Sequence, residues 1–298
     1  MSAILQRFAA VFHDPPPALA FEISEGGIAV ARLRPKLEMA FQPLKPGVIG
    51  VSPLRDNVID PDQFSAAVRA AAGPNGTRKR RDAALVLPDH CARIAVLDFV
   101  DFPSDRKEQL SLVRFRLRKS VPFDVEEAAV SYWPQPAGGK KMDVVTAVAP
   151  QEIVARYEAP FRAAGLNPGF VTISSLAFLE LLQEKSLVVA AKLSGRVLNV
   201  MVLDKGRLRL VRSLELVSGG LPEVAADLYP TFVYVEDQLG APAGKLLLAG
   251  FGERTEAARD QFQRELGIDV EPVRTLTGMP DESNAGLLGY LRSVAQVN

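Results

Sequence analysis

Cysteine and histidine are scarce in this chain of 298 residues, which has Cys91 as its one cysteine and His13 and His90 as its two histidines. A single cysteine excludes an internal disulfide framework and a cysteine-based zinc cluster. Two histidines are too few for a histidine metal centre. The sequence therefore predicts a protein without a resident metal.

An excess of charge is also lacking, because 35 Lys and Arg residues balance 35 Asp and Glu residues. Nucleic acids and anionic lipids attract proteins through a cationic excess, so we expect no nucleic-acid partner. No apolar run approaches the roughly 20 residues that span a bilayer. Residues 1–12 lack the cationic start and long apolar stretch of a secretory signal. These absences predict a cytoplasmic protein.

What the chain does contain is an ordinary globular composition, with 48% hydrophobic and 23% charged residues. At about 150 residues per domain, its length favours two domains. We expect an amphipathic helix and a proline-rich spacer over 1–19, a first domain over 20–185 and a second over 186–298.

Both halves open with strands that flank a small, Gly-rich turn. In the first half, strands at Ala20–Ile23 and Ile28–Leu33 flank the turn 24–27, and a third strand is expected near Phe41–Ile49. In the second half, strands are expected at 187–193, 197–203, 208–216 and 245–249, with a short helical segment after Gly220. A helix after Pro150 should bend or restart at Pro160. A last helix over 284–294 is predicted to pack back on the first domain.

The order of these elements resembles the PilM family of type IV pilus assembly, which belongs to the actin-like ATPase superfamily. The resemblance is carried by four segments, Val121-Pro122-Phe123-Asp124, Ala164-Gly165-Leu166, Gly219-Gly220 and Ala285-Gly286-Leu287. It implies an α/β fold of duplicated, actin-like (RNase H-like) domains. It also implies an inserted α+β subdomain at about 88–140.

The same resemblance marks three segments as the nucleotide cradle, in which family members that bind ATP with Mg²⁺ use two Asp-Ile-Gly hairpins and a Gly-Gly motif. The corresponding segments here are Glu22-Ile23-Ser24-Glu25-Gly26-Gly27, Lys192-Leu193-Ser194-Gly195-Arg196 and Gly250-Phe251-Gly252. In the first hairpin Glu25 replaces a small residue of the family, and in the second Lys192 replaces the aspartate. Phe251 stands where the family has glycine.

Charge placement decides how this cradle is interpreted. A carboxylate ~4 Å from a phosphate oxygen costs about 4 kcal/mol at an effective dielectric constant near 20. We therefore expect no cofactor, no metal and no enzymatic activity. The remaining positions form a vestigial pocket: Glu22, Ser24, Glu25, Gly26, Gly27, Lys192, Ser194, Gly195, Gly250 and Gly252.

The resemblance further implies a scaffold that binds the cytoplasmic N-terminal peptide of a PilN-like bitopic inner-membrane protein and so associates peripherally with that membrane. The expected contact residues are Arg114, Arg116, Arg118 and Phe123 in the inserted subdomain. Pilus assembly ATPases and further copies of the chain are possible additional partners. The alternatives are an ATP-hydrolysing PilM-like protein and a GspL-like cytoplasmic component of type II secretion.

Overall fold

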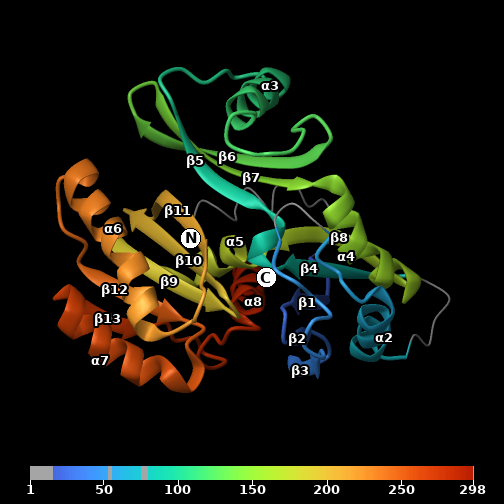
Figure 1. Ribbon diagram of the computed structural model, residues 1–298. Helices are drawn as coiled ribbons and strands as arrows, with labels where there is room; N and C mark the ends of the chain where they lie inside the picture. Colours follow the sequence, from blue (N-terminus) through green and yellow to red (C-terminus); the bar gives the residue numbers. More distant parts are fainter. Residues whose placement is uncertain (1–15, 53–55, 75–79, 298) are drawn as a thin grey trace.

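The chain folds around two five-stranded sheets with the same strand order, as a computed structural model covering residues 16–52, 56–74 and 80–297 shows (Figure 1). The N-terminal helix expected from the sequence lies outside these residues. The first sheet has the order β3-β2-β1-β4-β8 and the second has the order β11-β10-β9-β12-β13. Their bounds are β1 Leu19–Ile23, β2 Gly27–Arg32, β3 Glu38–Pro43, β4 Arg81–Leu87, β8 Leu166–Ile173, β9 Val188–Ser194, β10 Val197–Asp204, β11 Arg207–Glu215, β12 Lys245–Ala249 and β13 Asp269–Pro272.

Corresponding strands of the two sheets pair in the same way. β1 pairs antiparallel with β2 and parallel with β4, and β9 pairs antiparallel with β10 and parallel with β12. The expected α/β fold of duplicated domains is therefore confirmed. The third strand is β3 at Glu38–Pro43, which begins and ends earlier than the 41–49 segment expected from the sequence.

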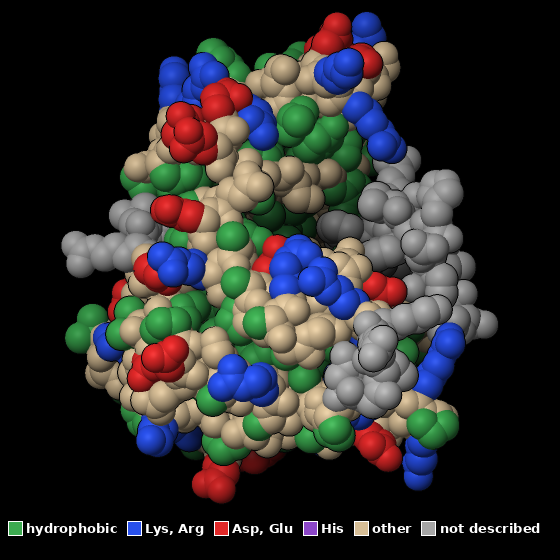
Figure 2. Space-filling model, turned by 90° about the vertical axis from the view of Figure 1, so that its right-hand side faces the viewer, with side chains coloured by type: hydrophobic (Ala, Val, Ile, Leu, Met, Phe, Trp, Pro, Cys, Tyr) green, Lys and Arg blue, Asp and Glu red, His purple; other side chains and the backbone are tan. Residues whose placement is uncertain are grey.

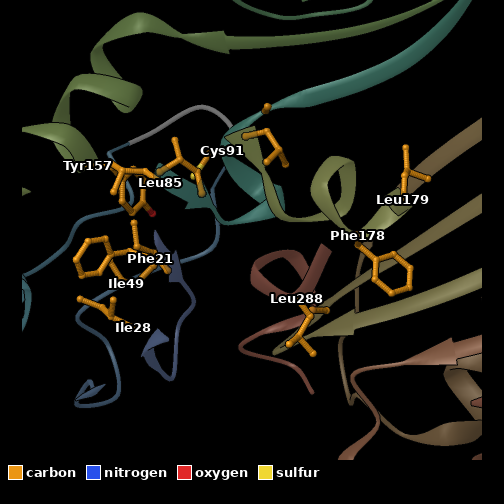
Figure 3. Packing of buried hydrophobic residues seen from close by; sticks show 14 of the residues in the cluster. Phe21, Ile28, Ile49, Leu85, Cys91, Tyr157, Phe178, Leu179 and Leu288 are labelled. Atoms are coloured by element: carbon orange, nitrogen blue, oxygen red, sulfur yellow. The ribbon is translucent and has the colours of Figure 1, made fainter. Parts of the chain in front are cut away.

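Helices cover both faces of the first sheet. α2 (Pro61–Ala72) and α4 (Gln151–Ala163) pack on one face, where Phe64, Tyr157 and Phe161 join Phe21 in a hydrophobic cluster. Figure 3 shows Phe21 and Tyr157 within this cluster. α5 (Ser174–Phe178) and α8 (Ala285–Val297) lie on the other face. α8 is the last helix of the chain, and it packs against α5, β1 and β2 of the first half.

The inserted subdomain is a three-stranded sheet with one helix, at the top of Figure 1. Its strands are β5 (Arg93–Phe99), β6 (Ala128–Gly138) and β7 (Lys141–Pro150), in the order β5-β7-β6, and its helix is α3 (Arg106–Leu117). Because β7 pairs with both other strands, the subdomain extends past residue 140 to Pro150.

This subdomain covers β11, the edge strand of the second sheet. The Gln135 side chain donates to the Leu208 carbonyl at 2.9 Å and accepts from the Leu208 N–H at 3.0 Å, as a neighbouring strand would. Arg209 and Asp143 form an ion pair at 2.7 Å across the same contact. The edge of the second sheet is thus capped within the chain.

Two helices differ from the sequence expectation at their prolines. α6 (Leu221–Leu239) is long rather than short and continues through Pro230, and α4 continues through Pro160 as one helix. A proline removes one backbone donor. The buried faces of these helices offset that loss, through side chains such as Val224 and Leu228 on α6 and Tyr157 on α4. α7 (Thr255–Leu266) completes the second half, with the short 3-10 turns η1 (Asp89–Cys91), η2 (Leu179–Leu181) and η3 (Gly252–Arg254). Among the described helices, none has the length and apolar character needed to cross a membrane.

Candidate functional site

The two hairpins of the predicted cradle occupy equivalent places in the duplicated sheets. Glu22 stands on β1 two residues before the turn residue Ser24, and Lys192 stands on β9 two residues before Ser194. The strand pairing fixes this register. A carboxylate and an ammonium group thus stand at the same position of the repeat, one in each half.

Lys192 is fully buried and binds across the interface between the halves. Its Nζ contacts Asp89 Oδ2 at 2.6 Å and Ser194 Oγ at 2.7 Å. Asp89 belongs to η1 in the first half, where it also accepts from the Ser175 N–H at 2.7 Å and from Asn199 Nδ2 at 2.7 Å. Every charge in this network is matched, which a buried ion pair requires.

Glu22 is buried beside this network. Its carboxylate accepts from the Ser174 hydroxyl and, at 2.6 Å, from the N–H of Leu287 on α8. Burial raises the pKa of Glu22 to about 7, although the nearby Lys192 ammonium opposes that rise. The side chain ties α8 and α5 to β1.

The raised pKa of Glu22 predicts a pH dependence of stability. Because the folded protein holds this proton up to about pH 7, whereas the unfolded carboxyl loses it near 4.5, the stability contributed by Glu22 falls as pH rises through that window. Replacing Glu22 with Gln should remove the fall. The free energy of unfolding of the variant minus that of wild type should rise by up to about 3 kcal/mol as the pH is raised from 4.5 to 7.

Urea unfolding at a series of pH values measures this difference. The comparison with wild type cancels two other buried groups that titrate in the range, Glu180 with a pKa raised to about 7 and His90 with a pKa lowered to about 4, both by burial. If the difference in unfolding free energy between the two proteins stays constant from pH 4.5 to pH 7, the pKa of Glu22 is not raised by folding.

Glu25 reaches from the first hairpin toward the second. A Cβ added at Gly195 would lie 3.2 Å from Glu25 Oε2, so the carboxylate is next to the opposite turn. Burial raises the pKa of Glu25, whereas the nearby Arg196 opposes that rise. Its Oε1 is buried without a hydrogen-bond partner among the described residues. The carboxylate therefore faces the space between the two turns.

That space opens into a cleft of about 1090 Å³ between the two halves. Six of the predicted positions line it: Ser24, Glu25, Gly26, Gly195, Gly250 and Gly252. Glu22, Ser24, Glu25 and Ser194 line a much smaller cavity of about 20 Å³ beside it, with Asp89 and His90. Lys192 lies behind these surfaces, and Gly27 packs against β3, where a Cβ would come within 2.5 Å of the Gln42 carbonyl oxygen.

The glycines after β12 have different structural roles. Gly250 has a φ of +82°, and a Cβ there would lie 1.9 Å from the Leu193 carbonyl oxygen. Gly252 has a φ of +53° with no atom within 4 Å of an added Cβ. Phe251 turns into the second core, 5.9 Å from the Phe262 ring centre. Close packing of β12 on β9 thus requires Gly250 even without a nucleotide.

The arginines expected to contact a partner are paired within the inserted subdomain. Arg114 and Arg118 bind the Glu126 carboxylate at 3.0 and 2.5 Å. Arg116 contacts Asp98 at 3.3 Å and lies 5.1 Å above the Phe99 ring centre. Phe123 is half-buried against the core of the subdomain. All four residues lie on one subdomain, where the three arginines pair with acids near its surface, and their contact with a partner stays a prediction.

Sequence reasoning missed the central residue of the site, Asp89, and the partners Ser174 and Asn199. Asp89 follows the buried strand β4, which ends beside β1. An acid two residues after a central apolar strand, in a chain with Lys192 inside another apolar strand, was the available signal. In the described part of the chain, no group of three or more His, Cys, Asp or Glu side chains is arranged to hold a metal ion.

Comparison with known proteins supports the fold. No family model and no curated protein matches the sequence. A chain of the PilM–PilN type IV pilus biogenesis complex aligns with a TM-score of 0.78 and 19% identity, over 94% of this chain and 99% of that one. A Bacteroides thetaiotaomicron protein with an actin-like ATPase fold and unknown function aligns with a TM-score of 0.54 and 12% identity, over 92% and 94%.

A third similar structure is the cytoplasmic domain of EpsL, an inner-membrane component of the type II secretion system of Vibrio cholerae. It aligns with a TM-score of 0.48 and 12% identity, over 77% of this chain and 80% of that one. This score is too low to support the type II secretion alternative. The expected resemblance to PilM is confirmed as a similarity of fold. A sequence identity of 19% shows the shared fold alone.

Proposed function

We propose that this protein is a PilM-like adaptor of a type IV pilus assembly platform, which binds the cytoplasmic tail of a PilN-like membrane protein and works without ATP. Through that partner it would sit at the cytoplasmic face of the inner membrane. The fold similarity to a chain of the PilM–PilN complex, along nearly the whole length of both chains, supports the assembly role.

The observation that carries the proposal is the buried Lys192–Asp89 ion pair. A triphosphate with Mg²⁺ needs backbone donors around the phosphates and acidic ligands for the metal. Here Lys192 occupies the acidic position of the second hairpin and is neutralised by Asp89, while Glu25 faces the space between the turns. The residues present do not fit Mg-ATP.

The candidate surface for this peptide is a small groove of about 30 Å³ below the inserted subdomain. Figure 2 shows a hollow lined by hydrophobic side chains between this subdomain, at the top, and the body of the molecule. A groove between the inserted sheet and α5 is lined by Ser131, Tyr132, Trp133, Val145, Thr146, Ala147, Leu176 and Leu179. An apolar groove with a polar rim can hold an extended or helical peptide through a few side-chain anchors.

Calorimetric titration with the N-terminal peptide of a PilN-like protein tests the binding. We expect micromolar affinity that is reduced at least tenfold by Ser131→Arg, because the exposed Ser131 lines the groove and an arginine would fill it. Ser111→Arg, on the exposed face of α3, is the matched control and should bind as wild type does. Absence of heat at high micromolar peptide would count against the adaptor.

A thermal-shift measurement tests independence from ATP. A nucleotide present at 100 times its dissociation constant would add about 2.7 kcal/mol of stability. We expect millimolar Mg-ATP to leave the melting temperature unchanged, and to leave the peptide affinity unchanged as well. A clear rise in melting temperature would show that the cradle still binds nucleotide.

A further inference from the structure

The two duplicated sheets differ at their corresponding edge strands. β11, the edge of the second sheet, is covered by the inserted subdomain through Gln135 and Asp143. β3, the corresponding edge of the first sheet, pairs with β2 alone among the described residues. An uncovered edge strand presents a row of backbone donors and acceptors that another strand can use.

Three exposed apolar side chains lie on or next to this edge strand. Leu37, Met39 and Phe41 are 39%, 40% and 50% exposed and recur at every second position. Met39 pairs with Ala31 and Phe41 with Ala29, so both share the sheet face on which α8 packs beside them. Exposed apolar side chains along a free sheet edge indicate a surface that another molecule covers.

Two of these side chains, Met39 and Phe41, also line the cleft between the halves, together with Ala40 and Leu44, and these four residues are called its floor. The lining residues include four carboxylates, Glu25, Glu253, Asp281 and Glu282, against one guanidinium, Arg254. This negative rim repels phosphate groups, whether of a nucleotide or of a lipid, and attracts cationic groups. These apolar side chains lie beside a strand edge that is unpaired among the described residues. We therefore expect the cleft to favour a ligand with an extended peptide backbone.

We propose that β3 and the adjoining cleft bind an extended, basic peptide segment of a partner protein, which adds to β3 as a strand. Its alternate apolar side chains would contact Met39 and Phe41, and its Lys or Arg side chains would lie along the rim formed by Glu253 and Glu282. Strand addition supplies affinity through main-chain hydrogen bonds and specificity through alternate side chains.

This surface is separate from the groove below the inserted subdomain. β3 lies at the end of the molecule opposite α3 (Figure 1). Two docking surfaces at opposite ends would let the protein bridge two partners. The proposal therefore goes beyond the adaptor function and stands or falls independently of the PilN-like tail.

Selection from a phage-displayed library of random dodecapeptides against the intact protein tests the proposal. We expect the recovered peptides to alternate Lys or Arg with apolar residues. Fluorescence anisotropy of the best peptide should show at least tenfold weaker binding to the double variant Glu253→Lys/Glu282→Lys, in which two exposed rim acids are reversed. Methylation of alternate backbone nitrogens in the peptide should weaken binding to a similar extent, because it removes the strand donors.

Glu127→Lys/Glu236→Lys is the matched control, with the same change in net charge at exposed sites outside the cleft. It should bind the peptide as wild type does. The proposal is overturned if the recovered peptides are not enriched in basic residues, or if the rim variant and the control bind equally. Peptides lost from Ser131→Arg but retained by the rim variant belong to the other groove and would also count against it.

Discussion

Replacing Lys192 with methionine is expected to lower the free energy of unfolding by about 3–5 kcal/mol, the usual cost of removing one partner of a buried ion pair. Asp89 would then lie in the interior without its counter-ion, with the Asn199 side chain and the Ser175 N–H as its remaining donors. Urea unfolding at neutral pH measures the loss. Arg118→Met is the matched control, because Arg118 pairs with Glu126 at the surface and such pairs contribute about 0–1 kcal/mol.

A second substitution distinguishes a charge effect from a packing effect. Asp89→Asn should destabilise the wild-type protein, because Lys192 loses its counter-ion. In the Lys192→Met background the same change should restore stability, because it removes the unmatched carboxylate. If Asp89→Asn destabilises both backgrounds equally, the ion pair is not the element that joins the two halves.

The alanine variant of Gly250 should lose about 2–5 kcal/mol of unfolding free energy. Left-handed backbone costs a non-glycine residue about 1–2 kcal/mol, and a misfitting core atom costs about 1–3 kcal/mol more. At Gly250 both apply, because the φ is +82° and the new Cβ would lie 1.9 Å from the Leu193 carbonyl oxygen. Thermal or urea unfolding without any nucleotide measures the loss.

Gly252, two residues further on, provides the matched control. Its φ of +53° carries the backbone cost, but nothing lies within 4 Å of an added Cβ. Gly252→Ala should therefore lose only about 1–2 kcal/mol. Equal losses at the two glycines would mean that β12 does not need Gly250 to pack on β9.

Local sequence signals were sufficient for most of the repeated strands. The turns at Ser24–Gly27 and Gly195–Arg196 are short and rich in glycine, and apolar runs flank both of them, so the hairpins could be located. β3 was placed too late in the chain, near Phe41–Ile49 instead of Glu38–Pro43, although Leu37, Met39 and Phe41 alternate as strand residues do. α6 was predicted too short, because Pro230 resembles a helix-ending signal although the buried face continues past it to Val235.

The site was less predictable than the fold, since its contacts join distant segments. The exchange of charge at Lys192 could be read from the hairpin, but its partner Asp89 lies 103 positions earlier and in the other half. In the same way, Glu22 meets the Leu287 N–H across a separation of 265 positions. Composition and periodicity report on neighbours along the chain, and they contain no information about which buried charges meet.

The buried Lys192–Asp89 ion pair restricts which substitutions this chain can accept. Placing an acid at position 192 would set it against Asp89, and removing Asp89 would leave Lys192 without a counter-ion. Each single step passes through an intermediate that is several kcal/mol less stable than its neighbours, out of a typical total of about 5–15. An acid at position 192 is therefore accommodated only together with a change at Asp89, so that the two positions can vary as a pair but not singly.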